Sequence, residues 1–371
     1  MSNHIIKDLV IKLVKPIKLL IIITFLLSFQ TCKSPTAPKV DLLPDTTSHN
    51  WNFESFQFGG AASSDFQDIA IINDSLAIAV GSIYLYDSTG TVDPYPYCLA
   101  IWNGQTWQLK RLYDRSNHLI PGLRSIKAFS QSDIWLADGG VYRWDGKSKQ
   151  ISIFYDRIDL IGGEENFQSV NKLWGISSTD LYGVGYKGMI THFDGNSWQK
   201  IPSGINFQFS DIYGDVDLNT GKQQILAVAF QDNPPERAIL TIQGNTSTLI
   251  SPYPIEQINE FFSLWFIPNQ HYYVVGDGIY EKTLLSDSLW KDNLFNITRK
   301  ATTKIKGNGL NDIFVVGSFG ECLHWNGESW KSYIDQTGLS NGSFTSVAIK
   351  GNLVIAVGGN NNQGVITIGR R

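Results

Sequence analysis

The chain has 371 residues, of which 42% are hydrophobic and 17% charged, a balance too apolar for a disordered protein. Its 34 glycines and 11 tryptophans, with only two methionines, favour many short strands and tight turns over long helices. The formal net charge is −4, so the protein is not expected to attract a phosphate backbone electrostatically, and nucleic acid is not expected as a partner.

The N-terminal segment has the order of a secretory signal. Lysines come first, and an apolar run, LLIIITFLLSF, follows and ends at Phe29. The run is much shorter than the roughly 20 residues that cross a bilayer, which favours a cleaved signal over a transmembrane helix. The segment around Cys32 resembles a bacterial lipobox, in which the cysteine thiol receives diacylglycerol. We therefore expect a lipoprotein signal peptide at residues 1–31 and lipidation of Cys32, with plain secretion or an uncleaved anchor as alternatives.

Residues 32–49 read CKSPTAPKVDLLPDTTSH, with several prolines and no hydrophobic periodicity. Such a composition is typical of a tether between a lipid and a folded domain. The expected location is the bacterial cell envelope, with the protein exported and lipid-anchored at the outer membrane or cell surface. The folded domain is predicted over residues 50–371.

One short pattern recurs seven times in the folded part. The copies are LAIAVG, DIWLAD, DLYGVG, QILAVA, HYYVVG, DIFVVG and LVIAVG, and they end at residues 81, 138, 185, 229, 276, 317 and 358. The copies lie about 46 residues apart on average, which is the length of one four-stranded propeller blade. Seven copies predict seven blades.

The flanks of each copy predict the other strands of a blade. An apolar strand precedes the pattern (SIKAF, KLWGI, FSLWF, TSVAI), and a strand ending in an aromatic residue and an Asn-Gly or Asp-Gly turn follows it (IWNG, YRWDG, THFDG, LHWNG). These dipeptides form two-residue hairpin turns. A strand that opens with tryptophan comes next. The fold class is therefore predicted to be all-β, with four antiparallel strands per blade, named A to D.

The two ends of the chain are predicted to form one blade together. The last repeat stops at Arg371 after three strands, whereas the segment NWNFESF at residues 50–56 has the pattern of a D strand. We expect this N-terminal strand to close the last blade, which leaves no free sheet edge. The tryptophans all fall in predicted strands and are expected to pack between blades. Cys98 and Cys322 show no paired spacing and are expected to be buried, unpaired side chains.

The segment DIFVVGSFGECLHWNGESW at residues 312–330 resembles the repeats of bacterial exported β-propellers, a family of mostly unassigned function. The turns DGNSW and NGESW are similar to degenerate Asp-box (BNR) turns. In that family the box is a structural turn between strands C and D. The resemblance therefore implies the architecture and no catalytic activity.

The candidate ligand face is the one that carries the B–C and D–A loops, by analogy with other propellers. Its longest loop is the blade 1 insertion SIYLYDSTGTVDPYPYC. Aromatic rings beside carboxylates suit glycans and also protein partners, although surface loops are commonly polar and tyrosine-rich. The candidate binding residues are Tyr84, Tyr86, Asp87, Asp93, Tyr95, Tyr97, Asp114, Arg115, His118, Arg157, Glu164, Asp232, Arg237 and Tyr253.

One stretch has the spacing of metal ligands. Asp215, Asp217 and Asn219 in DVDLNTGKQQ could wrap a calcium ion, and the same residues also suit a plain turn between strands A and B of blade 4. No other cofactor is expected.

The function class favoured by the sequence is a non-catalytic binding or scaffold lipoprotein with a glycan or protein partner. The alternative is a carbohydrate-active enzyme, either a glycoside hydrolase or a lyase, which requires two carboxylates in one pocket. The candidates are Asp87, Asp93, Asp114, Asp159, Glu164, Asp232 and Glu236. Some similar propellers carry a glucosyltransferase label, but that reaction needs an α/β nucleotide-binding fold that this sequence does not predict.

Overall fold

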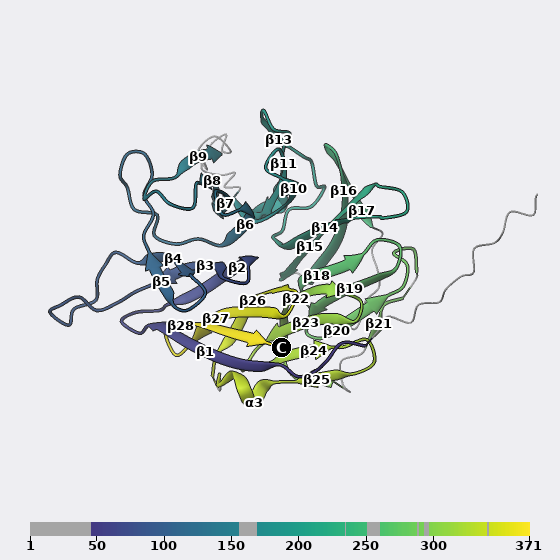
Figure 1. Ribbon diagram of the computed structural model, residues 1–371. Helices are drawn as coiled ribbons and strands as arrows, with labels where there is room; N and C mark the ends of the chain where they lie inside the picture. The colour runs from purple at the N-terminus through teal and green to yellow at the C-terminus, as the bar shows by residue number, and fades with distance from the viewer. Residues whose placement is uncertain are drawn as a thin grey trace, which may run out of the picture. The chain divides into compact units, whose positions relative to one another are not determined.

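The computed structural model describes residues 46–155, 169–233, 235–250, 260–287, 289–292, 297–339 and 341–371. In the unit from Pro44 to Arg371, the strands form seven sheets of four antiparallel strands each (Figure 1). The innermost strand of each sheet contacts the innermost strand of the next, and that of the seventh contacts that of the first. The predicted seven-bladed propeller is confirmed. The predicted signal peptide and most of the predicted tether lie outside the described residues.

The strands of the first four blades follow chain order from the channel outwards. Blade 1 consists of β2 (Asp65–Asn73), β3 (Leu76–Ile83), β4 (Tyr97–Trp102) and β5 (Trp107–Lys110). Blade 2 consists of β6 (Ser125–Ser130), β7 (Asp133–Asp138), β8 (Gly140–Trp144) and β9 (Ser152–Tyr155). Blade 3 consists of β10 (Val170–Ser177), β11 (Asp180–Gly185), β12 (Ile190–Phe193) and β13 (Trp198–Lys200). Blade 4 consists of β14 (Phe209–Val216), β15 (Gln223–Asp232), β16 (Pro235–Gln243) and β17 (Thr246–Ile250).

The last three blades are built in the same way, and the outermost strand of blade 7 comes from the N-terminal segment. Blade 5 consists of β18 (Phe261–Ile267), β19 (His271–Gly276), β20 (Ile279–Lys282) and β21 (Lys291–Asp292). Blade 6 consists of β22 (Thr302–Gly309), β23 (Asp312–Gly317), β24 (Cys322–Trp325) and β25 (Trp330–Ser332). Blade 7 consists of β26 (Ser343–Lys350), β27 (Leu353–Asn360), β28 (Gln363–Arg370) and β1 (Asn52–Gly59). Two short helical turns, η2 (Tyr186–Gly188) and α3 (Ile334–Thr337), lie in connections. No described helix is long and apolar enough to cross a membrane.

The recurring pattern is the second strand of every blade, and it is apolar on both faces because it lies between two other blades. In β3, Ala77 and Ala79 pack against blade 7, whereas Ile78 and Val80 pack against blade 2. A strand buried on both faces gives a continuous apolar run in the sequence instead of an alternating one.

A glycine ends this strand in five blades because the backbone of the innermost strand comes too close for a side chain. A Cβ atom on Gly185 would lie 1.7 Å from the carbonyl oxygen of Ser169, and one on Gly317 would lie 2.1 Å from that of Ala301. Gly81, Gly276 and Gly358 are each similarly close to a carbonyl oxygen at the start of the inner strand of their own blade. The glycine of the repeat is therefore a packing requirement.

Hydroxyl groups on the inner strands connect neighbouring blades. Each inner strand but β6 has a register shift near its start, and three of the residues at these shifts are Ser210, Thr303 and Thr345. The hydroxyl of Thr303 lies 2.6 Å from the carbonyl oxygen of Phe344 in the next blade, and that of Thr345 lies 2.5 Å from the oxygen of Phe66. Ser210 donates in the same way to Phe261. These bonds satisfy carbonyl groups that the irregular register leaves without a ladder partner.

The N-terminal strand closes the ring as predicted. β1 pairs antiparallel with β28 over its whole length, from Asn52 opposite Arg370 to Gly59 opposite Gln363 (Figure 1). Trp51 is buried and packs edge-on against Phe314 of blade 6, with the ring centroids 5.0 Å apart. The two ends of the chain thus complete one sheet and seal it against its neighbour.

A chain of polar contacts holds the segment before β1 against blade 6. Arg371 donates two hydrogen bonds to Asp312, at 3.2 and 2.7 Å, and the buried His324 binds the same carboxylate through Nε2 at 2.9 Å. Nδ1 of His324 lies 2.9 Å from Nδ1 of His49, which links the segment before β1 to this group of contacts. Burial and the nearby His324 lower the pKa of His49, so this contact favours the neutral ring.

The predicted roles of the tryptophans and cysteines also hold. The side chains of Trp102, Trp135, Trp144, Trp174 and Trp265 are buried within or between blades. Cys98 and Cys322 are buried and unpaired, and burial raises the pKa of the Cys98 thiol to about 12. Neither thiol is placed to act as a nucleophile.

Candidate functional site

The blade 1 insertion between β3 and β4 is held in shape by its own aspartates. Asp87 accepts hydrogen bonds from the backbone N–H groups of Thr89 and Thr91, at 2.8 and 3.0 Å, and from the Thr89 hydroxyl at 2.6 Å. These bonds lower the pKa of Asp87. Its carboxylate is therefore engaged in stabilising the loop.

A second aspartate fixes the return of the insertion. Asp93 forms a 2.5 Å ion pair with Arg111, whose guanidinium lies 4.0 Å from the centre of the Tyr97 ring. Backbone and arginine hydrogen bonds lower the pKa of Asp93. Tyr86 and Tyr95 remain 58% and 61% exposed, so the insertion presents two aromatic rings at its surface.

The other described candidates lie on separate parts of the ring. Asp114 closes a turn by accepting from the backbone N–H of His118 at 2.8 Å, and Arg115 donates to Ser152 of blade 2 at 3.1 Å. Asp232 and Arg237 flank the β15–β16 turn of blade 4, three blades away from the insertion. The structure does not bring these two residues together with the blade 1 candidates. Arg157, Asp159, Glu164 and Tyr253 lie outside the described residues.

Three of the candidate carboxylates, Asp87, Asp93 and Asp114, differ from the general acid of a glycosidase, whereas burial raises the pKa of Asp65 at the start of β2 and of Glu260. A general acid needs a raised pKa, whereas local hydrogen bonds lower the pKa of Asp87, Asp93 and Asp114. Glu260 has a raised pKa, caused by burial and by repulsion from Asp232 and Asp277. It stands at the start of blade 5 and was not among the residues predicted from the sequence.

Two of the candidate calcium ligands, Asp217 and Asn219, lie in the turn between β14 and β15, whereas Asp215 lies in β14. Asp217 accepts from the backbone N–H of Asn219 at 2.8 Å, from Thr220 at 2.9 Å and from Asn269 of blade 5 at 2.9 Å. Asp215 accepts from the backbone N–H of Val216 at 2.8 Å. In the described part of the chain, no three His, Cys, Asp or Glu side chains are grouped so as to hold a metal ion. Calcium at this turn stays a prediction.

Two adjoining hollows lie beside the base of the blade 1 insertion, and both include Arg124 and Asp138. The first, of about 400 Å³ between blades 1 and 2, is also lined by Asp65, Gln67, Ser82 and Tyr84. The second, of about 450 Å³ between blades 2 and 3, is also lined by Ser169, Asn171, Tyr186 and Lys187. We call them the Arg124 hollows. Arg124 Nε lies 3.2 Å from Asp138, and both side chains are partly exposed.

Of the predicted residues that the structure describes, Tyr84 alone lines the Arg124 hollows. Arg124 itself lies just beyond the predicted D–A loop of blade 1, immediately before the SIKAF strand. A basic residue placed at the entry of an inner strand is the signal that sequence reasoning missed.

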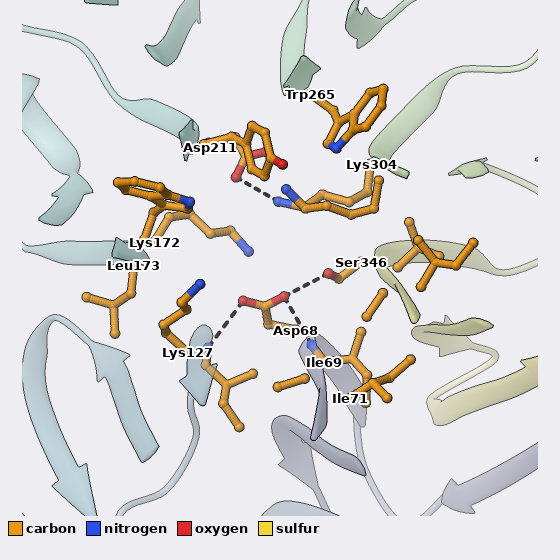
Figure 2. Close-up of a pocket in the computed structure, with 18 of the residues that line it drawn as sticks. Asp68, Ile69, Ile71, Lys127, Lys172, Leu173, Asp211, Trp265, Lys304 and Ser346 are labelled. Atoms are coloured by element: carbon orange, nitrogen blue, oxygen red, sulfur yellow. Dashed lines mark hydrogen bonds and ion pairs between the residues drawn. The ribbon is translucent and has the colours of Figure 1, made fainter. Parts of the chain in front are cut away.

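The axial channel is the third feature of the site, and sequence reasoning did not find it. On each inner strand, one residue pairs with the residue just before the last position of the recurring pattern. Because the pairing is the same in every blade, these residues lie at one level along the channel. These seven residues form the first ring, which consists of Asp68, Ser125, Lys172, Asp211, Ser263, Lys304 and Ser346. Figure 2 shows that the side chains of Asp68, Lys172, Asp211 and Lys304 converge on one central space.

The acids of the first ring are fully bonded. Asp68 accepts from Ser125 at 3.1 Å and from Ser346 at 2.7 Å. Asp211 accepts from Ser263 at 2.6 Å and pairs with Lys304 at 2.7 Å. Burial alone would raise the pKa of Asp211, but the charges of Lys304 and Lys306 outweigh burial and lower it to about 2. Nearby lysines and hydrogen bonds also lower the pKa of Asp68 against the effect of burial. Both acids are therefore ionised, and their bonds involve six of the seven blades around the axis.

Comparison with known proteins identifies the class of fold. No protein-family description and no curated protein matches this chain. Among solved structures, "YCF48 bound to D1 peptide" is 14% identical, with 87% of this chain and 98% of that chain covered and a TM-score of 0.60. The WD40 β-propeller domain of Doa1 gives the same values, and "YCF48 from Cyanidioschyzon merolae" is 11% identical over 85% and 98% of the two chains, with a TM-score of 0.56. At these identities the likeness establishes a β-propeller fold.

Proposed function

We propose that this propeller is a non-catalytic binding scaffold of the bacterial cell envelope that holds an extended segment of a partner protein in the Arg124 hollows. The observation that carries the proposal is that two adjoining hollows, each lined by donors and acceptors, share one arginine. An extended peptide can place successive side chains in neighbouring hollows, as peptides do on other binding surfaces. One similar propeller, YCF48, has been solved with the D1 peptide bound, which supports a peptide on this fold.

Arg124 is suited to take a carboxylate of the partner. Its guanidinium offers a planar set of donors that matches a carboxylate in a bidentate way. Its present partner, Asp138, is a partly exposed acid at 3.2 Å, and exposed ion pairs of this kind contribute little to stability. A partner carboxylate can therefore replace Asp138 at small cost. Lys187 in the second hollow adds a further positive charge.

The peptide proposal is tested by selecting displayed peptides against the full chain in a non-ionic detergent. We expect the selected peptides to carry acidic side chains, and Arg124→Ala to weaken their binding about tenfold or more. Lys222→Ala is the matched control, because Lys222 is an exposed residue in the β14–β15 turn at the opposite end of the blades. Peptides that bind the Arg124→Ala variant as tightly as the unchanged chain would contradict the proposal. Binding of oligosaccharides alone, lost in Tyr86→Ala and Tyr95→Ala, would replace it with a glycan partner.

The envelope part of the proposal rests on the sequence around Cys32. If its thiol carries the lipid, cells that express the protein incorporate a labelled fatty acid into it and retain it with the membrane fraction. Cys32→Ser is expected to abolish the label and release the protein from the membrane. A Cys32→Ser variant that stays labelled, or an unchanged chain that never takes up label, would rule out the anchor.

A further inference from the structure

The axial channel encloses a cavity of about 270 Å³ whose wall changes character along the axis. The first ring lies at one level. Two residues further along each inner strand lies a second ring, which consists of Ala70, Lys127, Trp174, Tyr213, Trp265, Lys306 and Ala348. All seven of these residues line the cavity. The second ring thus combines two ammonium groups with three large aromatic rings.

The two rings differ in charge balance. In the first ring, the two acids are matched by two lysines, because Lys304 pairs with Asp211 and Lys172 interacts favourably with Asp68. The second ring contains Lys127 and Lys306 and no acid. The cavity therefore has two more positive than negative side chains, in a chain whose formal net charge is −4.

Lys127 and Lys306 approach the axis from blades that lie across the channel from each other, blades 2 and 6 of seven. Lys306 lies over the Tyr213 ring at 4.4 Å, and Lys127 lies 5.5 Å from the centre of the Phe129 ring. Among the described residues, neither lysine forms an ion pair with a carboxylate. Figure 2 shows Lys127 and Lys172 directed into the same space as the carboxylate of Asp68.

The surroundings of both lysines disfavour their charged forms. Burial lowers the pKa of Lys127, and burial together with repulsion from Lys304 lowers the pKa of Lys306 to about 7. The groups that face Lys306 are Lys304 and Lys127, which lower its pKa, and Asp211 and Asp68, which raise it. A negative charge between the two blades would relieve this repulsion.

We propose that the axial channel is a binding site for a small organic phosphate monoester, held between Lys127 and Lys306 beside the aromatic side chains of the second ring. The two ammonium groups match the two negative charges of a monoester, and each is a strong hydrogen-bond donor to phosphate oxygens. Trp174, Trp265 and Tyr213 line the cavity and give it an apolar wall for the less polar body of the ligand. A cavity of about 270 Å³ accepts a molecule of the size of a hexose phosphate and excludes a long polymer.

The probe is glucose 6-phosphate, titrated calorimetrically into the full chain in detergent at constant ionic strength, with inorganic phosphate and glucose as comparisons. We expect saturable binding of glucose 6-phosphate, and at least about a tenfold loss of affinity in the Lys127→Met and Lys306→Met variants. Lys222→Met, at an exposed turn, is the control and should leave binding unchanged. Removal of a repelling charge should not lower the melting temperature of the unliganded protein, so loss of binding in these variants is distinguishable from unfolding.

The dependence on pH gives a second readout. A bound phosphate raises the pKa of Lys306 from about 7, so the complex binds more protons than the free protein and the affinity falls as the pH rises above about 7. Binding of inorganic phosphate with an affinity equal to that of glucose 6-phosphate would show that the organic body contributes nothing and would overturn the monoester as the ligand. Absence of saturable binding, equal binding of glucose, or unchanged affinity in both lysine variants would overturn the proposal. Arg124→Ala should bind the phosphate normally, so this proposal and the peptide proposal fail independently.

Discussion

Asp211→Ala is expected to destabilise the propeller by about 3 kcal/mol or more, because it leaves the buried ammonium of Lys304 without its partner. Asp211 and Lys304 are only 3% and 7% exposed, and their atoms lie 2.7 Å apart. The substitution also removes the acceptor of the buried Ser263 hydroxyl. The free energy of unfolding in urea, measured by tryptophan fluorescence, gives the loss directly.

A double variant separates the loss of the pair from the loss of packing. Asp211→Ala combined with Lys304→Met removes both charges, and it should recover a large part of the stability lost in the single variant. Asp87→Ala is the control, because Asp87 bonds only within an exposed loop. A single variant as stable as the unchanged chain, or a double variant less stable than the single one, would contradict this account of the channel.

Gly317→Ala is expected to cost about 3 kcal/mol, although it adds one methyl group in a strand. Its Cβ would lie 2.1 Å from the carbonyl oxygen of Ala301 and 3.0 Å from Cα of Thr302, so the backbone of β22 would have to move. That movement would disturb the first ring at Lys304, two residues further on. We expect a lower midpoint in urea with an unchanged slope.

Blade 4 supplies the matched control for this glycine. There the equivalent residue is Ala229, opposite Phe209, so this blade already accommodates the methyl group. Ala229→Gly should cost only about 0.5 to 1 kcal/mol, from added backbone freedom in the unfolded chain. Equal losses in the two variants would show that steric contact at Gly317 is not the cause.

The fold could be predicted because its determinants are local and repeated. Each blade has a buried second strand of continuous apolar residues, and several end in the glycine that the inner strand requires. The Asn-Gly and Asp-Gly dipeptides marked hairpins between strands C and D correctly, but the expected two-residue turns were wrong. Four residues separate the paired ends, with Trp102 opposite Trp107, Phe193 opposite Trp198 and Trp325 opposite Trp330, because the Asn or Asp side chain accepts from the backbone N–H three residues on. The pairing of β1 with β28 could also be predicted from the sequence, because the last repeat lacks one strand and the N-terminal segment has one extra strand.

The blade 1 loop residues show where sequence reasoning is weaker. Asp87, Asp93 and Asp114 suggested ligand contacts by residue type, and the structure shows each bonded within its own loop or to Arg111. An aspartate that stabilises a turn and one that binds a ligand have the same sequence signature, because the acceptors and donors nearby decide between them.

The sequence by itself determined the number of blades and the strands within each blade, because these follow from the apolar pattern, glycines and turn residues within one repeat of about 46 residues. It also determined the closure of the ring, because the last repeat lacks the one strand that the N-terminal segment supplies. The tertiary structure alone decided the charge of the channel. The first ring takes one residue from each inner strand, and in blade order these residues are Asp, Ser, Lys, Asp, Ser, Lys and Ser, so neighbouring blades contribute different residue types. Their balance, and the excess of Lys127 and Lys306, arise only where seven distant segments meet at the axis.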